Sequence, residues 1–214
     1  MTQTKIPATP TIRRLPSYLH IIKQAQSEGT EYISGTVIAN ELNLEPIQVR
    51  KDLALTGITG KPKRGYPVGE LICAIEHFLG WDTPKKAVLI GAGNLATALS
   101  GYQEFKYHGL NFVAAFDTSA DRIGKTIHDV PIFALDELAA KVKELEVTIA
   151  VLTVPSSQAQ QTAETVVQAG INAIWNFTNT KLKVPDHVAV QREDLTSGFA
   201  MLSVMISGST QTND

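Results

Sequence analysis

The sequence predicts an α/β protein in two parts: an N-terminal winged-helix domain over residues 1–82, followed by a Rossmann-like, doubly wound parallel sheet over residues 83–193. Two observations carry this division. From Pro84 onward, short apolar runs alternate with segments of helical periodicity, which is typical of strands covered by helices on both faces. Before Trp81, helical patterns dominate and no parallel-sheet strand is evident. The chain is long enough to bury two small cores.

Three helices are predicted in the first domain, with Ser34 as the N-cap of the second: Leu15–Ser27, Thr36–Leu42 and Pro46–Leu55. The short connection between the second and third helices indicates a helix-turn-helix motif. This motif predicts DNA binding, with the third helix as the recognition helix.

In that third helix, Ile47 and Leu53 are expected to face inward, whereas Gln48, Arg50 and Lys51 point outward. Gln and Arg side chains suit the hydrogen-bonding edges of bases, and Lys suits phosphates. We therefore expect these three polar side chains to contact double-stranded DNA.

The segment from Thr56 to Tyr66 is basic, punctuated by Gly and Pro, and too irregular for a helix. It is predicted to form a hairpin wing whose Lys61, Lys63 and Arg64 contact the DNA backbone or the minor groove. The basic pair Arg13 and Arg14 is expected to add to the same interface. The alternative is a basic surface loop with no DNA contact.

The second domain is predicted to contain five strands: Ala87–Ile90, Phe112–Phe116, Pro131–Phe133, Val147–Val154 and Ala173–Asn176. Helices are expected between them over Asn94–Tyr107, Leu135–Glu144 and Ser157–Gln168, with Gly170 as the C-cap of the last helix.

The first strand runs into Gly91-Ala92-Gly93, and Ala96 takes the place of the third small residue of a dinucleotide-binding fingerprint. The two glycines allow a tight turn and a close approach to a pyrophosphate. The helix that begins at Asn94 and Leu95 would direct its N–H groups at that anion. By itself the motif is also compatible with an ordinary strand-to-helix turn.

Asp117 ends the second predicted strand, where a carboxylate can accept both hydroxyls of a ribose. Its charge predicts a preference for NADH over NADPH, although Arg122 can compensate if its side chain folds back. Thr153, Val154 and Pro155 follow the fourth predicted strand, at the edge of the sheet where open α/β folds bind ligands.

Beyond the sheet, residues 194–207 form a short apolar segment that would expose a large patch on a monomer. The apolar residues lie between Leu195 and Ile206. Residues 208–214 have no apolar anchor and are predicted to be disordered.

The formal net charge of −2 argues against a general nucleic-acid coat, and 43% hydrophobic residues are typical of a globular protein. The chain has no apolar run of the roughly 20 residues that span a bilayer, and its first residues lack a signal core. We expect a cytoplasmic protein without a membrane partner. Cys73, the only cysteine, lies in an apolar run and is predicted to be a buried, unreactive thiol.

Taken in order, the motifs resemble the Rex family of bacterial redox-sensing transcriptional repressors. The residues that carry the resemblance are Arg13-Arg14-Leu15-Pro16, Val49-Arg50-Lys51-Asp52-Leu53, Gly91-Ala92-Gly93-Asn94-Leu95, Ala114-Ala115-Phe116-Asp117, Leu152-Thr153-Val154-Pro155, Asn176-Phe177, Val184-Pro185 and Asp194-Leu195. They span nearly the whole chain.

This resemblance implies a homodimer that binds palindromic operators, is released by NADH, and senses NADH in competition with NAD+. It also implies that Tyr102 and Asp194 form a hydrogen-bonded pair that responds to the nicotinamide, and that Arg14 contacts this aspartate in another state. The apolar segment Leu195–Ile206 resembles the helix that Rex subunits exchange, so the resemblance implies that it is helical. No catalytic residue and no metal site are expected.

The wing departs from the family pattern. Ala54-Leu55-Thr56-Gly57 stands where the family usually has Ser-Tyr-Phe-Gly, and Pro67 replaces a polar residue. These differences concern the operator contacts more than the cofactor site.

Two enzyme alternatives remain. A dehydrogenase needs a substrate domain and a general acid or base near the nicotinamide, yet the five histidines are scattered and few residues follow the sheet. A CoA-binding enzyme domain would use a similar glycine loop, but Asp117 favours a ribose diol.

Overall fold

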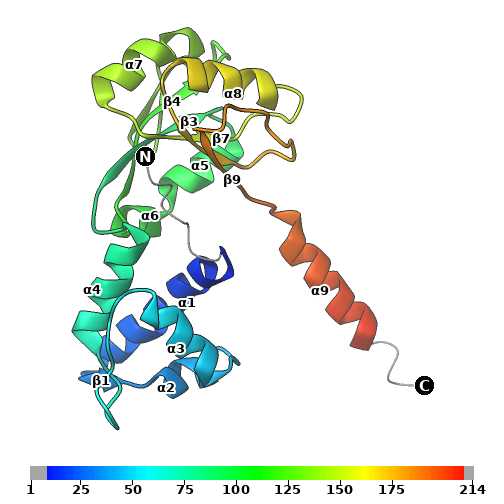
Figure 1. The fold of residues 1–214 in the computed structure, drawn as a ribbon. Coiled ribbons are helices and arrows are strands. Elements are labelled where there is room, and N and C mark those ends of the chain that lie inside the picture. The colour runs from blue at the N-terminus through cyan, green and yellow to red at the C-terminus, as the bar shows by residue number, and fades with distance from the viewer. Residues whose placement is uncertain (1–8, 210–214) are drawn as a thin grey trace. The chain divides into compact units, whose positions relative to one another are not determined.

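The computed structural model describes residues 9–209 and divides into two compact units between Thr83 and Pro84 (Figure 1). The N-terminal unit contains α1 (Thr9–Ser27), β1 (Tyr32–Ile33), α2 (Gly35–Glu41), α3 (Pro46–Ala54), β2 (Tyr66–Pro67) and α4 (Val68–Leu79). Ser34 caps α2 as predicted, because its side chain accepts a hydrogen bond from the N–H of Val37.

A hairpin follows α3, in which Lys61 pairs antiparallel with Gly65. It leads into β2, which pairs antiparallel with β1 from before α2. Gly65 has φ 93°, and a Cβ there would lie 2.4 Å from the carbonyl oxygen of Ile33, so only glycine fits this close approach. The predicted winged helix is therefore confirmed.

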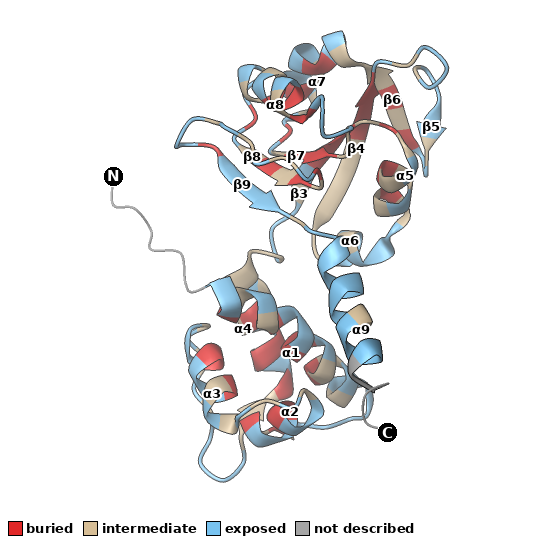
Figure 2. Cartoon of the chain, turned by 90° about the vertical axis from the view of Figure 1, so that its right-hand side faces the viewer, coloured by how far each residue is buried: buried red, intermediate tan, exposed pale blue. Residues whose placement is uncertain are grey.

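The core of this unit brings together α1, α3 and α4, as the buried residues in Figure 2 show. Val49 and Leu53 are the apolar residues of α3 that are fully buried. The prediction for Ile47 was wrong, since it is 59% exposed; the inward face of α3 starts at Val49 instead. The predicted burial of Cys73 was also wrong, because α4 turns this thiol to the surface.

α1 begins six residues before the predicted start at Leu15, and Pro16 lies inside it. A proline is usually found in the first helical turn, which is why the sequence favours a later start. In the structure, Thr11 and Arg14 hold the first turns of α1 through hydrogen bonds to Asp52 of α3.

Asp52 is buried and accepts hydrogen bonds from four side chains. Its oxygens lie 2.8 and 3.0 Å from Nε and Nη2 of Arg14, 2.7 Å from the Tyr18 hydroxyl, 2.9 Å from the Thr11 hydroxyl and 2.9 Å from Nε2 of Gln48. Burial alone would raise the pKa of Asp52, but these donors outweigh it and lower the pKa below 3.8. The ionised carboxylate therefore ties α1 to α3.

The C-terminal unit contains β3 (Lys85–Ile90), α5 (Asn94–Gly101), α6 (Gln103–Tyr107), β4 (Leu110–Asp117), β5 (Thr126–Ile127), β6 (Val130–Ala134), η1 (Leu135–Glu137), α7 (Leu138–Leu145), β7 (Ile149–Leu152), α8 (Ala159–Gln168), β8 (Ala173–Asn176), β9 (Ala189–Arg192) and α9 (Thr196–Ser209). The sheet order is β5-β6-β4-β3-β7-β8-β9, and all neighbouring strands are parallel except β5 and β6. This is the doubly wound order, with β5 added at one edge.

Helices cover both faces of the sheet, with α7 and α8 on one side and α5 on the other (Figure 1). Along β3, Val88 and Ile90 belong to the core under α7 and α8, and Leu89 belongs to the core under α5. Because both faces are buried, the strand sequence has no polar alternation.

Several boundaries differ from the prediction. The predicted helix Asn94–Tyr107 breaks at Tyr102, whose extended backbone (φ −78°, ψ 103°) separates α5 from α6. The predicted strand Val147–Val154 is shorter at both ends, because Thr153 turns toward the glycine loop. β5 and β9 were not predicted: β5 has two residues, and β9 is an exposed edge strand.

α9 confirms the predicted C-terminal helix but continues to Ser209, so residues 208 and 209 are helical and not disordered. Residues 210–214 of the predicted tail lie outside the described residues. The apolar side chains of α9 are exposed, with Phe199 at 72% and Val204 at 70% (Figure 2). Over residues 9–209, no helix has the length and apolar character needed to span a bilayer.

We predict that Asp52→Ala lowers the free energy of unfolding of the N-terminal unit by about 3 kcal/mol, because four donors lose a buried acceptor. Hydrogen exchange in peptides from α1 and α3 measures this loss separately from the second unit. Glu41→Ala, which removes an exposed carboxylate of α2, is the control and should have little effect.

Because the pKa of Asp52 is lowered on folding, the contribution of its carboxylate to stability is present above pH ~4 and is lost as the pH falls below that value. Equal pH dependence in Asp52→Asn and the unsubstituted chain would contradict this role.

Candidate functional site

The glycine loop leaves β3 at Ile90 through Gly91, which has φ 94°. A Cβ at Gly91 would lie 3.0 Å from the carbonyl oxygen of Thr153 and 3.1 Å from Cγ1 of Val154. Gly93 differs, since its φ is −84° and a Cβ there would meet no atom within 4 Å. Gly91 is therefore required by the backbone conformation and by the close approach of Thr153 and Val154, whereas the space beside Gly93 can accept a ligand.

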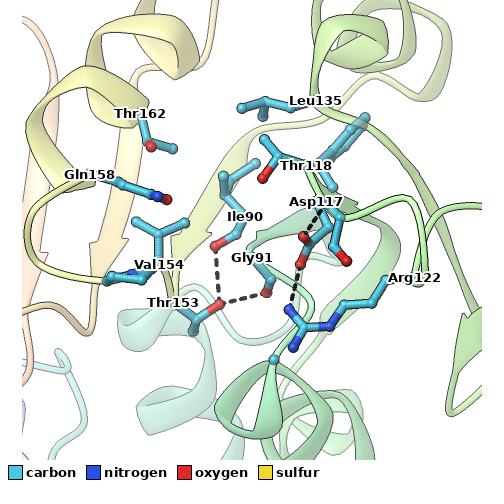
Figure 3. Close-up of a pocket in the computed structure, with 14 residues that line it drawn as sticks. Ile90, Gly91, Asp117, Thr118, Arg122, Leu135, Thr153, Val154, Gln158 and Thr162 are labelled. Carbon is cyan, nitrogen blue, oxygen red and sulfur yellow. Dashed lines mark hydrogen bonds and ion pairs between the residues drawn. The ribbon is translucent and has the colours of Figure 1, made fainter.

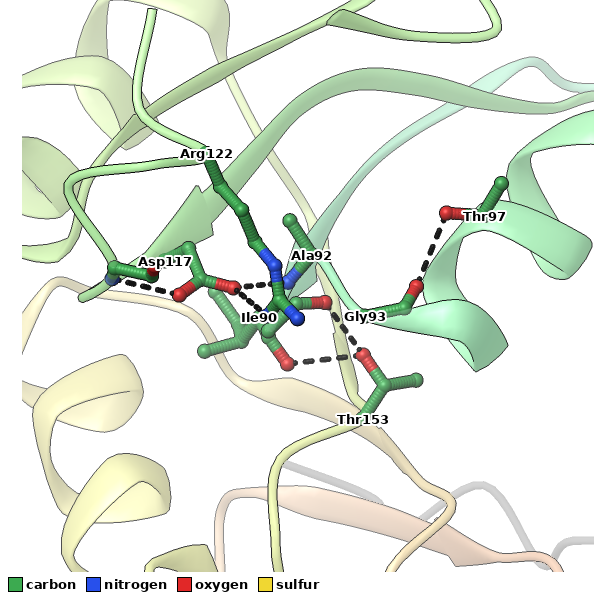
Figure 4. Close-up of polar contacts among 9 residues, drawn as sticks. Ile90, Ala92, Gly93, Thr97, Asp117, Arg122 and Thr153 are labelled. Carbon is green, nitrogen blue, oxygen red and sulfur yellow. Dashed lines mark hydrogen bonds and ion pairs between the residues drawn. The ribbon is translucent and has the colours of Figure 1, made fainter. Parts of the chain in front are cut away.

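Two side chains from neighbouring strands fix this loop (Figure 4). The Thr153 hydroxyl, after β7, lies 2.8 Å from the carbonyl oxygen of Gly91 and 3.1 Å from that of Ile90. The Asp117 carboxylate, at the end of β4, accepts a 2.7 Å hydrogen bond from the N–H of Ala92. These side chains thereby fix the shape of the loop.

Asp117 is 8% exposed and accepts two more hydrogen bonds, from the N–H of Ser119 at 2.8 Å and from Nη1 of Arg122 at 3.0 Å. Burial acts to raise the pKa of Asp117, but the two N–H groups and the guanidinium lower it below 3.8. Asp117 is therefore ionised at neutral pH, as an acceptor for ribose hydroxyls must be.

A cavity of about 580 Å³ opens at the carboxyl ends of β3, β4 and β7, where the strand order reverses. In Figure 3, Asp117, Thr118 and Arg122 lie on one side of it, and Val154, Gln158 and Thr162 lie on the other. The full lining is Ile90, Gly91, Gly93, Phe116, Asp117, Thr118, Ser119, Arg122, Leu135, Thr153, Val154, Pro155, Gln158 and Thr162.

Six predicted cofactor residues line this cavity: Gly91, Gly93, Asp117, Thr153, Val154 and Pro155. Ala92 and Ala96 are buried beside it, and Ala96 gives α5 its close contact with the sheet. Asn94 and Leu95 begin α5 and are not among the lining residues. Half of the residues predicted to bind the cofactor therefore line one cavity.

Tyr102 and Asp194 are not among the lining residues. Tyr102 is 55% exposed and contacts Phe105 edge-on at 5.0 Å between ring centroids. Phe105 in turn contacts Trp175 at 5.4 Å, and the indole N–H of Trp175 donates to Glu193 at 3.1 Å. Asp194 accepts hydrogen bonds from the N–H and hydroxyl of Thr196, which lower its pKa.

The predicted DNA-contacting residues fall into two groups. Arg13, Arg50 and Lys51 are exposed, as are the wing residues Lys61, Lys63 and Arg64. Arg14 and Gln48 are partly buried and donate hydrogen bonds to Asp52, so in this structure their side chains contact their own domain and do not extend from its surface.

Two basic side chains of the wing contact an aromatic residue at its base. The guanidinium of Arg64 lies 4.4 Å from the ring centroid of Tyr32, and Nζ of Lys61 lies 3.0 Å from the Tyr32 hydroxyl. Tyr32 therefore contacts two positive side chains of the hairpin.

Sequence reasoning missed Asp52, Tyr32 and the cavity residues Thr118, Ser119, Gln158 and Thr162. Asp52 had a usable signal, since it shares the inward face of α3 with Val49. The sequence signal for Gln158 and Thr162 was weaker: they stand four residues apart, at helical spacing, just after Pro155. Within residues 9–209, no three His, Cys, Asp or Glu side chains gather as metal ligands.

Comparisons with known proteins match both units. A family model described as "CoA binding domain" matches residues 82–180, and one described as "Putative DNA-binding protein N-terminus" matches residues 5–54. A protein of Treponema denticola named "Redox-sensing transcriptional repressor Rex" is 64% identical over 97% of this chain and 99% of its own length. Its namesake in Bacteroides fragilis is 42% identical over 95% of this chain and 91% of its own length.

Two solved structures share the whole architecture. The crystal structure of RSP in complex with beta-NAD+ and operator DNA has a TM-score of 0.89 and 31% identity, covering 97% of this chain and 96% of that one. The structure of RSP in complex with beta-NADH has a TM-score of 0.87 and 30% identity, covering 97% and 98%. A further structure of RSP describes it as a Rex-family repressor.

We predict that Gly91→Ala lowers the free energy of unfolding of the sheet domain by about 2 to 3 kcal/mol, because it combines a left-handed backbone with a contact against Thr153. Gly93→Ala is the matched control and should lower it by less than about 1 kcal/mol. Urea unfolding followed by circular dichroism measures both values. An equal effect of the two substitutions would show that Gly91 has no special backbone role.

Proposed function

The chain belongs to the Rex family of redox-sensing transcriptional repressors, and we propose that it binds operator DNA as a homodimer and releases it when NADH occupies the cavity beside Asp117. The observation that carries this proposal is the combination, in one chain, of a winged helix with a preformed dinucleotide loop. The relatives that match over nearly the full length carry the name of a repressor.

The cofactor would lie across the carboxyl end of the sheet. Its pyrophosphate would approach Gly93 and the first turn of α5, where the backbone leaves open space. The adenosine ribose would lie against Asp117, and Thr153, Val154 and Pro155 would line the opposite wall. NADH and NAD+ share these contacts, so the redox state must be read at the nicotinamide end.

We propose that Tyr102 and Asp194 distinguish the reduced nicotinamide from the oxidised one. Tyr102 lies where α5 breaks, directly after the helix that faces the pyrophosphate, and Asp194 lies just before α9. NADH can release DNA only if it binds one conformation of the dimer more tightly than the other. A contact that forms or breaks between these exposed side chains would supply such a difference.

The DNA surface would be formed by α3 and the wing. Arg50 and Lys51 are exposed on α3, and Lys61, Lys63 and Arg64 extend the positive charge along the hairpin, with Arg13 on α1. A second copy of the chain would cover the apolar side chains of α9 and pair the two recognition helices for a palindrome. We expect the protein to act in the cytoplasm, because both the chromosomal DNA and the nicotinamide cofactors are present there.

The match to a CoA-binding family model is compatible with this assignment, because that model covers only the sheet domain. An enzyme domain of that kind does not account for the winged helix or for the names of the full-length relatives. Asp117 also favours a ribose diol over the phosphorylated ribose of CoA.

We predict that a selection from random DNA duplexes recovers a palindromic site, and that NADH, but not an equal concentration of NAD+, releases the protein from it. A gel-shift titration of the selected duplex measures both steps. If the protein fails to retain any duplex, or retains the selected one equally with either nucleotide, the repressor assignment is wrong.

We predict that Arg50→Ala and Lys51→Ala each weaken operator binding by about tenfold, because each loses a contact worth 1 to 3 kcal/mol. Lys51→Ala should also reduce the slope of log affinity against log salt by about one, as expected for a lost phosphate contact. Lys143→Ala, an exposed lysine of α7, is the control and should leave affinity and slope unchanged. A normal salt slope in Lys51→Ala would place that lysine away from the DNA backbone.

A further inference from the structure

Tyr32 lies on the outer side of β1, at the base of the wing. Its neighbour Ile33 is buried in the core of the winged-helix domain, and successive side chains of a strand point to opposite sides. β1 pairs with β2, and Gly65 passes so close to Ile33 that only glycine fits there. The strand therefore fixes the backbone of Tyr32 beside the hairpin and directs its ring away from the core.

Two wing side chains contact Tyr32 in different ways. Cζ of the Arg64 guanidinium lies over the ring, 4.4 Å from its centroid. Nζ of Lys61 donates a hydrogen bond of 3.0 Å to the Tyr32 hydroxyl and lies 5.2 Å from the same centroid. Both contacts leave donors for another partner, because the five N–H groups of a guanidinium lie in its plane and an ammonium group has three. An anion can therefore bind either cation without displacing it from Tyr32.

The wing cations are gathered without a compensating carboxylate. Within residues 9–209, Lys61, Lys63 and Arg64 form no ion pair with an acidic side chain. The charges of Lys61 and Arg64 repel each other, yet both side chains contact the same tyrosine. A partner that brings negative charge to both would offset this repulsion, and a DNA duplex presents phosphates in a closely spaced series.

Lys63 differs from the other two wing cations. It has a left-handed backbone, with φ 62°, in a turn closed by hydrogen bonds from the N–H groups of Arg64 and Gly65 to the carbonyl oxygen of Lys61. Over the described part of the chain, the cations that contact Tyr32 are Lys61 and Arg64 alone. Lys63 is therefore an exposed wing cation whose position does not depend on Tyr32.

We propose that Tyr32 is a positioning residue for operator binding, which holds Lys61 and Arg64 in the orientation in which they contact DNA phosphates. The proposal rests on the proposed function, because DNA is the ligand that these cations would bind. Lysine and arginine side chains lose rotamer freedom when they bind a phosphate. Tyr32 restricts that freedom before the duplex arrives, so a smaller entropy loss remains for binding.

The test is a double-mutant cycle in the full-length protein, with affinity for the selected operator duplex measured by gel-shift titration at one salt concentration. Tyr32→Leu removes the ring and the hydroxyl, so it should weaken operator binding about tenfold, because two side chains must then be ordered on binding. In a background that carries both Lys61→Ala and Arg64→Ala, Tyr32→Leu should change the affinity less than about twofold.

Lys63→Ala is the matched background, because it also removes a wing cation, but one that Tyr32 does not contact. There Tyr32→Leu should keep its full effect of about tenfold. Tyr32→Phe gives a second cycle that preserves the ring: it should weaken binding about threefold by itself, and should have no effect once Lys61→Ala has removed the partner of the hydroxyl. Unfolding curves of each variant identify any loss that is due to folding.

Two results would overturn the role of Tyr32. Unchanged operator affinity in Tyr32→Leu and Tyr32→Phe would show that its contacts with the wing cations do not contribute to binding. Equal weakening by Tyr32→Leu with and without the two cations would show that this residue acts only through the fold of the domain. Both results differ from failure of the proposed function, in which the unsubstituted protein retains no duplex.

Discussion

The carboxylate of Asp117 is the constraint on which the cofactor site depends. It closes the glycine loop onto β4 through the N–H of Ala92, while Thr153 closes the same loop onto β7. These contacts fix the shape of the loop at the point where the strand order reverses. A ligand that binds here does not have to order the loop, and its binding energy remains available for biasing the conformation of the protein.

The winged helix is organised by a second buried carboxylate with an arginine partner. Asp52 joins α1 to α3 through Arg14, Tyr18, Thr11 and Gln48, and burial and the carboxylate raise the pKa of Tyr18 to about 12, so the phenol remains a donor. A recognition helix fixed in this way presents its exposed cations at defined positions. This arrangement also explains why Arg14, which the sequence suggests for DNA or for Asp194, is engaged within its own domain.

Features that depend on local pattern were predictable from the sequence. The glycine loop, Asp117 and Thr153 follow from short apolar runs that end in recognisable residues, and the winged helix follows from a capped helix pair and a basic turn. Features that depend on distant contacts were not. Thr11 and Asp52 are 41 residues apart, and β9 is an exposed strand without alternation. The ion pair of Arg122 with Asp117 could be predicted only in part. A separation of five residues permits the contact, but the sequence does not determine the rotamer of the arginine side chain.

The chain has two tryptophans, and each belongs to a different unit. Trp81 packs against the winged-helix core, and Trp175 lies in the aromatic series that joins Tyr102 to Glu193. Each unit thus carries one tryptophan as an intrinsic optical reporter, and replacing either indole by phenylalanine would leave a single tryptophan. Indole emission overlaps the absorption of reduced nicotinamide, so quenching by energy transfer would follow occupancy of the sensor without any attached dye.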